Sequence, residues 1–224
     1  MRYNGEREKV RVLWKEDAGD LLFAHEAALS AISSMVDRVA DIKFEEQPKN
    51  VEGRMSLTAQ FIQGIDICET AISEGLYSQA AALLKQEMET IEAVNDYETG
   101  QRRDKKTPQL NLLSGFGRIY GEFNNYAHVS VEDIHKSIVH FVKEDISGPS
   151  VHPQYQQHIA EYFFGYHVLF IIYCASQMMK ILREVYDLEL TVEELEWLAV
   201  AIKVLKDKDF IKTMNGDNDC KDGS

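Results

Sequence analysis

The sequence contains only three cysteines, and they lie far apart. Cys68, Cys174 and Cys220 form no Cys-x-x-Cys pair. An odd number of widely spaced cysteines indicates neither a zinc knuckle nor a disulfide framework. Cysteines that remain unpaired favour a reducing compartment, so we expect a cytoplasmic protein.

Positive charge is also scarce, with 24 lysines and arginines against 37 acidic residues and a net charge of −13. A protein that coats nucleic acid needs a basic surface to hold the phosphates, so this balance argues against such a role. It leaves room for a nuclease with a local basic patch. The connector over residues 101–106 carries four of the basic side chains. It is either a solvated loop or a patch that binds phosphate.

Neither a signal peptide nor a membrane span is indicated. The first nine residues are polar throughout, and no secretory signal is expected in them. The most apolar run, residues 162–175, is too short to cross a bilayer and contains Gly165 and His167. We interpret it as part of a core helix and expect no membrane association.

Apolar residues repeat at helical spacing along most of the chain, which is 45% hydrophobic. We therefore predict an all-α, single-domain bundle of about six to seven helices over residues 1–212. Residues 213–224 have nothing to bury and are predicted to form a disordered tail. His25 and Cys68 fall in the apolar stripes of the first two helices, so both are predicted to be core residues.

The pattern also predicts the individual elements. Helices are expected over 10–39, 57–72, 76–98 and 110–130, with a short one through Ile134 and Ile138. Gly75 is expected to end the second helix, and a capping start is expected at Ser130. Residues 139–151 are expected to form a loop or a small hairpin. The longest apolar helix is predicted to start at Pro153, and the last to follow a capping box at Thr191 and Glu194.

The sequence also predicts how the 110–130 helix starts and what packs against its glycines. Thr107 is predicted to cap it, with Pro108 in its first position. Gly115, Gly117 and Gly121 lower helix propensity, so we expect a neighbouring helix to pack closely against them.

The candidate site lies on the helices 76–98 and 110–130. Tyr120, Asn124 and His128 are spaced four apart, which places them along one edge of a helix. A phenol, an amide and an imidazole in one line can position a substrate, with His128 moving protons near neutral pH. They can equally form a structural hydrogen-bond ladder to Glu87 or Glu89. In either case we expect His128 to face inward, toward one of these acids.

Glu87 falls inside the apolar stripe of the 76–98 helix, four residues from Leu83 and four from Ile91. Desolvating a bare carboxylate is costly. Glu87 must therefore lie at the stripe's edge, pair with a base, or stay protonated.

Six of the seven histidines lie between positions 128 and 167, which raises the alternative of a metal-binding bundle. Glu132 and His135 have the Glu-x-x-His spacing of di-iron carboxylate bundles, and His158 and Glu161 have the reverse spacing. A helical metal site needs four or more facing ligands, and only one copy of the motif is present. We therefore predict neither a metal nor another cofactor.

Two segments together resemble a known family. Ala-Ala-Leu-Leu-Lys85-Gln-Glu-Met-Glu89, followed by Tyr120-x-x-Phe-Asn124-x-x-x-His128, resembles HEPN-like helical domains, near the bacterial AbiV abortive-infection group. The resemblance covers residues 57–140. It implies an HEPN-like core in which Lys85 and Glu89 occupy the basic and acidic positions. It also implies that Asn124 takes the place of a serine and that His128 is the motif histidine.

Active HEPN ribonucleases carry an Arg-x(4–6)-His motif, and this chain lacks it. The residues four to seven before His128 are Asn124, Phe123, Glu122 and Gly121, and Arg118 lies ten positions away. The resemblance therefore implies a non-enzymatic module of a bacterial defence or toxin–antitoxin system, either a homodimer or a partner of another protein.

The alternative is a metal-independent ribonuclease or phosphate-handling enzyme. In it His128 acts as general acid or base, beside Lys85 or the 102–106 loop, and RNA is the partner. An open His128 with a cation in reach favours the enzyme, and a sealed, hydrogen-bonded His128 favours the module. On the module hypothesis, His128→Ala is expected to lower stability more than any activity.

Overall fold

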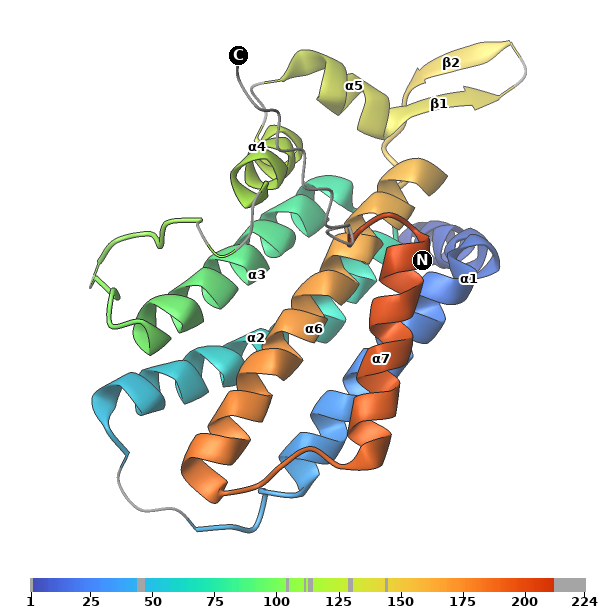
Figure 1. Ribbon diagram of the computed structural model, residues 1–224. Helices are drawn as coiled ribbons and strands as arrows, with labels where there is room; N and C mark the ends of the chain where they lie inside the picture. The colour runs from blue at the N-terminus through green and yellow to red at the C-terminus, as the bar shows by residue number, and fades with distance from the viewer. Residues whose placement is uncertain are drawn as a thin grey trace, which may run out of the picture.

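The computed structural model describes residues 2–43, 47–103, 105–110, 112, 115–128, 131–143 and 145–211. This part of the chain forms seven α-helices and one β-hairpin (Figure 1). The elements are α1 (Arg2–Asp37), α2 (Lys49–Ser73), α3 (Tyr77–Glu98), α4 (Phe116–Ala127), α5 (Glu132–Val139), β1 (His140–Lys143), β2 (Ile146–Pro149), α6 (Gln157–Tyr186) and α7 (Val192–Asp207). The prediction of a mostly helical single domain with six to seven helices is confirmed, with a small hairpin added.

Helix α6 occupies the centre, and α1, α2, α3 and α7 pack against it. Its aromatic side chains Phe163, Phe164 and Phe170 are fully buried, which explains why the helix is apolar on nearly every side. Among the described helices, α6 is the one long and apolar enough to cross a membrane. However, 72% of its most apolar window is buried inside the fold. The expected core helix is thus found, although it is longer than the run 162–175.

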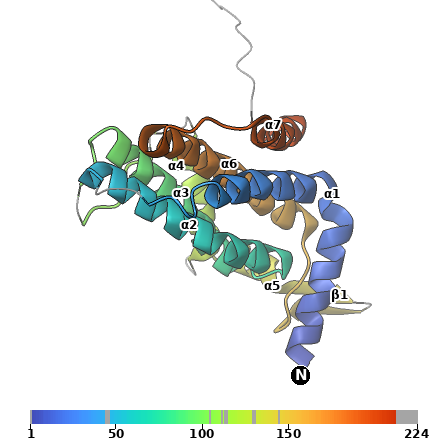
Figure 2. The ribbon, with the colours of Figure 1, turned by 90° about the horizontal axis from the view of Figure 1, so that it is seen from below.

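Helix α1 bends at Gly19, where the backbone angles φ 38° and ψ −110° are not helical. Figure 2 shows its two halves running in different directions. The helix predicted over 10–39 therefore begins earlier and is not straight. Its N-terminal half is held by ion pairs from Arg7 and Arg11 to Glu74, a buried residue that follows α2.

Helix α3 agrees with the prediction, whereas α2 begins at Lys49, eight residues before the predicted start at Leu57. Gly75 separates the two helices with a positive φ of 73°. A side chain at Gly75 would approach the Gln154 carbonyl oxygen to 3.0 Å, so glycine is required there for space as well as for backbone angle. Cys68 and His25 are both buried, at 0% and 2% exposure, as their positions in the apolar stripes predicted.

The start of α4 differs from the prediction. The helix begins at Phe116, so Thr107 and Pro108 lie in the preceding loop and do not cap it. Gly115 is the N-cap residue, in the left-handed region with φ 93°. The interpretation of the other two glycines is also wrong, because no atom lies within 4 Å of a Cβ built at Gly117 or Gly121. Both face open space, so no helix packs closely against them.

Two further boundaries differ from the prediction, while the hairpin is confirmed. Helix α5 is capped by Val131 without a side-chain hydrogen bond, and Ser130 lies outside the described residues. Helix α6 begins at Gln157, four residues after the predicted Pro153. Strands β1 and β2 pair antiparallel, with His140 opposite Pro149. The tail predicted over 213–224 lies outside the described residues.

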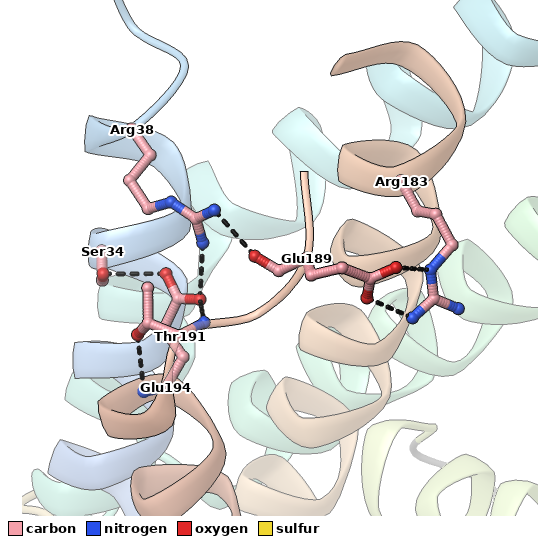
Figure 3. Close-up of polar contacts among 6 residues, drawn as sticks. All are labelled: Ser34, Arg38, Arg183, Glu189, Thr191 and Glu194. Carbon is pink, nitrogen blue, oxygen red and sulfur yellow. Dashed lines mark hydrogen bonds and ion pairs between the residues drawn. The ribbon is translucent and has the colours of Figure 1, made fainter. Parts of the chain in front are cut away.

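The capping box at the start of α7 is confirmed, and it also fixes this helix to α1 (Figure 3). The Glu194 amide donates to the Thr191 hydroxyl, and the Thr191 amide donates to the Glu194 carboxylate. Ser34 and Arg38 of α1 donate to the two oxygens of the same carboxylate, at 2.8 and 2.7 Å. Burial would raise the pKa of Glu194, but the hydrogen bonds from the Thr191 backbone, Ser34 and Arg38 together lower that pKa below its usual value.

Candidate functional site

Helices α3 and α4 pack side by side and bring most of the predicted site residues together. The Lys85 ammonium donates to the Asn124 side-chain oxygen at 2.7 Å. The same ammonium lies 3.5 Å from Nε2 of His128 and 5.0 Å from the centre of the Tyr120 ring. Lys85 therefore contacts all three residues of the predicted line on α4.

Glu89 joins this group through Tyr120, whose hydroxyl donates to the Glu89 carboxylate at 2.6 Å. This hydrogen bond, followed by burial and the Glu89 charge, raises the pKa of Tyr120 to about 12. Tyr120 therefore keeps its proton at neutral pH and acts as a hydrogen-bond donor, not as a base. We call Lys85, Glu89, Tyr120, Asn124 and His128 the outer cluster.

His128 does not face inward toward an acid, and that expectation is wrong. Its side chain is exposed, and the contact described for it is with the cation Lys85. His128 is the C-cap residue of α4 and has an extended backbone, so the helical spacing from Asn124 ends at this residue. Nε2 accepts a hydrogen bond from Lys85 only while that nitrogen carries no proton.

Glu87 lies on the opposite side of α3 and does not belong to the outer cluster. At about 100° per residue, positions 85 and 89 differ by about 40° around the helix, whereas position 87 is turned by about 200° from 85. Glu87 is buried and pairs with Nδ1 of His167, which lies 2.9 and 3.0 Å from its two carboxylate oxygens. The two acids that the sequence left as alternatives thus serve two separate groups.

The partner of Glu87, His167 on α6, was not predicted as a site residue. The sequence offered one signal, because His167 interrupts an otherwise apolar run that must be buried. Cys68 of α2 completes this group. Burial first, and then the charge and hydrogen bond of Glu87, raise the pKa of the Cys68 thiol. We call Cys68, Glu87 and His167 the inner cluster.

The basic connector after α3 lines a small cavity of about 80 Å³. Arg102 Nη1 donates to the backbone oxygens of Arg103 and Lys106, so this arginine holds the loop in shape. Its guanidinium also lies 5.8 Å from the centre of the Tyr97 ring. These contacts agree with the first of the two alternatives, a solvated loop. The contacts described for Arg102 include no residue of the outer cluster.

The two histidine–glutamate spacings that suggested a metal do not form a ligand group. Glu132 pairs with Lys136 at 2.6 Å, and Glu161 accepts from Gln157 at 3.0 Å. In the described part of the chain, the group of potential metal ligands that come within 4.8 Å of one another is the inner cluster.

The fold and the outer cluster define a mostly helical, single-domain protein with a polar group between two neighbouring helices. No protein-family model, no curated protein and no solved structure matches the chain.

Proposed function

We propose that this chain is an HEPN-like helical module that acts without catalysis of its own in a bacterial defence or toxin–antitoxin system in the cytoplasm. The observation that supports this best is the outer cluster. Lys85 of α3 contacts Asn124 of α4 and His128 at its C-cap, and Glu89 of α3 accepts a hydrogen bond from Tyr120 of α4. These are the residues that the HEPN resemblance assigned to its two motifs.

The exposed His128 with Lys85 in reach is the arrangement expected of the enzyme, but the pairing of the other members of the outer cluster favours a structural role. Lys85 is hydrogen-bonded to Asn124, and Glu89 is hydrogen-bonded to Tyr120. Arg118, the nearest preceding arginine on α4, is exposed and pairs with Glu122, at 2.5 Å. A ribonuclease of this kind uses histidine and arginine together at the phosphate, and no arginine contact with His128 is described.

A homodimer is part of the proposal, and exposed apolar side chains on the first and last helices support it. Leu13 and Phe23 of α1 are 46% and 58% exposed, and Leu195 of α7 is 53% exposed. The proposal requires that such side chains form one contiguous apolar surface, because a contiguous surface of this kind favours association with another chain. Contact with a different protein is the alternative for this surface.

A second candidate is a phosphate-handling enzyme, and one observation favours it. His128 is exposed with the Lys85 ammonium only 3.5 Å away, so both groups can reach one phosphate. Lys85 would stabilise the charge on the phosphate oxygens, and His128 would transfer the proton. RNA is the substrate class this candidate implies, and the net charge of −13 weighs against tight binding of it.

The experiment that separates the two candidates is RNA cleavage in the presence of EDTA. Labelled single-stranded RNA is incubated with the wild type, His128→Ala, Lys85→Met and the control His158→Ala. His158 is another exposed histidine, at the start of α6 and outside the outer cluster. The module predicts no cleavage by any of the four proteins.

Cleavage by the wild type and His158→Ala, with none by His128→Ala and Lys85→Met, would replace the module with the enzyme. The defence role is tested separately by plating phages on bacteria that express the chain. Protection that survives His128→Ala supports the module, and the absence of protection against a broad phage panel contradicts the defence setting.

A further inference from the structure

The inner cluster places three potential metal ligands from three helices in the core. Cys68 of α2 and His167 of α6 are 0% exposed, and Glu87 of α3 is 7% exposed. One ligand atom from each residue lies within 4.8 Å of those of the other two. A thiol, a carboxylate and an imidazole converge here although most of the surrounding side chains are apolar.

We propose that the inner cluster binds a single zinc ion, with Cys68 Sγ, a Glu87 carboxylate oxygen and His167 Nδ1 as its protein ligands. This site is independent of the outer cluster, because Glu87 points to the opposite side of α3 from Lys85 and Glu89. It also goes beyond the proposed function, which requires no metal.

The types of ligand select zinc among the common divalent ions. Zinc binds sulfur, nitrogen and oxygen donors, whereas magnesium and calcium require sets of oxygen ligands. A thiolate and a carboxylate carry two negative charges, and a neutral imidazole adds none. With one Zn²⁺ the buried centre has no net charge, so it avoids the large cost of burying an uncompensated ion.

The spacing of the three ligand atoms is close to the spacing of neighbouring ligands in a tetrahedral zinc site. Zinc–ligand bonds of about 2.0–2.3 Å place neighbouring ligand atoms about 3.2–3.8 Å apart. His167 Nδ1 lies 2.9 and 3.0 Å from the Glu87 oxygens, and all three ligand atoms are within 4.8 Å. Side-chain shifts of about 1 Å therefore complete the arrangement. On binding, the Cys68 thiol proton leaves to solvent and the His167 ring takes the tautomer with its hydrogen on Nε2.

Two buried imidazole nitrogens at the inner cluster have no described hydrogen-bond partner. As a hydrogen-bonded group, Glu87 accepts from Cys68 and pairs with Nδ1 of His167. However, Nε2 of His167 is buried without a hydrogen-bond partner among the described residues, and so is Nε2 of the adjacent His25. The two imidazole rings lie 5.4 Å apart, centre to centre. Buried polar atoms without partners are rare in native proteins. A zinc ion on Nδ1 leaves Nε2 of His167 as it is, so the proposal rests on the three converging ligand atoms and not on these nitrogens.

A small cavity lies next to the site and touches it at Glu87. It has a volume of about 40 Å³ and lies between α2 and α3, lined by Gln60, Phe61 and Gly64 on one side and by Leu83, Gln86, Glu87 and Thr90 on the other. A cavity of this size holds a water molecule. Three protein ligands with a water in the fourth position form a recognised type of zinc site.

The test is a metal titration of the reduced, chelator-treated protein, with all proteins carrying Cys220→Ser so that this cysteine adds no ligand. Co²⁺ serves as the spectroscopic probe, and Zn²⁺ then competes with it. We expect one equivalent of Co²⁺ to bind with tetrahedral visible bands and a thiolate charge-transfer band, and one equivalent of Zn²⁺ to remove both. Zinc should also raise the unfolding temperature, because it binds the folded state.

Three variants and a matched control assign the ligands. Cys68→Ser is expected to lose the charge-transfer band. Glu87→Gln and His167→Gln are expected to weaken zinc binding by more than about 100-fold, beyond the usual effect of removing an outer-shell partner. Cys174→Ala is the control, because Cys174 is also a buried free thiol but is not a proposed ligand. It should retain the stoichiometry and the spectrum.

Two results would overturn the proposal, and neither depends on a variant that fails to fold. In the first, the Cys220→Ser protein with an otherwise unchanged inner cluster binds no equivalent of Co²⁺ or Zn²⁺. The inner cluster would then be a hydrogen-bonded group of the core. The other is an unchanged spectrum in folded Cys68→Ser, as checked by circular dichroism, which would place the metal elsewhere.

Discussion

At the scale of single residues, α3 shows how one short segment serves two groups. Lys85 and Glu89 point to α4, whereas Glu87, between them in sequence, points into the core toward α6. Motif resemblance selected Glu89 and apolar periodicity selected Glu87 as the important acid. Both acids make contacts in the structure, Glu89 with Tyr120 and Glu87 with His167. A helix turns by about 100° per residue, so the two positions face different neighbours.

Replacing His128 is expected to have little effect on stability, which revises the expectation drawn from the sequence. His128 is exposed, and its described contact is a 3.5 Å approach to Lys85. We predict that His128→Ala changes the free energy of unfolding by no more than about 0.5 kcal/mol, as is usual for surface positions. Urea denaturation measures this change. A loss above about 2 kcal/mol would show that His128 is buried in solution.

At the scale of elements, the α4 region departs most from what its sequence suggested. Thr107 and Pro108 form a good helix start by residue type, yet α4 begins at Phe116. The backbone amide of Leu112 instead donates to the Glu92 carboxylate at 2.8 Å, so a tertiary hydrogen bond holds the loop in a non-helical path. Local capping preferences of about 1 kcal/mol are small enough for such contacts to override.

The glycines at the start of α4 are predicted to respond in opposite directions to alanine. Gly115 has φ 93°, so Gly115→Ala should cost about 1 kcal/mol of stability. Gly117 and Gly121 are exposed helical positions with open space around them, so alanine at either should add about 0.5–1 kcal/mol. Chemical denaturation of the three variants tests this. Destabilisation by Gly117→Ala would indicate a neighbour packed against α4.

The capping box of α7 is predicted to make stability depend on pH. Glu194 has a lowered pKa in the folded protein, so its stabilising effect is present above the unfolded value of about 4.5 and is lost as pH falls through the folded value. At neutral pH, Glu194→Gln should lower the free energy of unfolding by about 1–3 kcal/mol, because the buried hydrogen bonds that Ser34 and Arg38 donate to this side chain weaken.

The difference between wild type and Glu194→Gln should therefore shrink when the unfolding midpoint is measured below pH 4.5. Glu196→Gln is the control, because Glu196 is exposed on the same helix. A pH-independent difference would show that the lost interaction does not require the charge on Glu194.

At the scale of the whole molecule, α6 organises the bundle, and the outer faces of α1 and α7 remain in contact with water. The homodimer proposed above would cover part of these faces. Phe23→Glu is expected to convert the dimer to a monomer in analytical ultracentrifugation, because Phe23 is a large apolar residue at 58% exposure on α1. Val142→Glu is the control, since Val142 is also exposed, at 70%, but lies on the hairpin. A wild-type monomer at all concentrations would contradict the dimer.

Much of the helical layout follows from the sequence. The apolar periodicity located α3 and α7 closely, and it found α1 and α2 although both begin eight residues before their predicted starts. The capping box fixed the start of α7 at Thr191. These are long amphipathic helices, in which the repeat of buried positions is strong enough to outweigh local irregularities. The start of α4 and the bend at Gly19 could not be predicted, because both depend on contacts or backbone angles that no local pattern encodes.

The sequence by itself named Lys85, Tyr120 and Asn124 as members of a polar group on α3 and α4, through spacing and motif together. It left Glu87 and Glu89 as alternatives for the acid, and the structure assigned Glu89 to this group. Only the tertiary structure decided that His128 meets a cation and not an acid. It alone brought Cys68, Glu87 and His167 together, because they come from helices separated by up to 99 positions in the chain. Periodicity specifies which face of a helix is buried, but the partner of a buried polar group depends on how the helices pack.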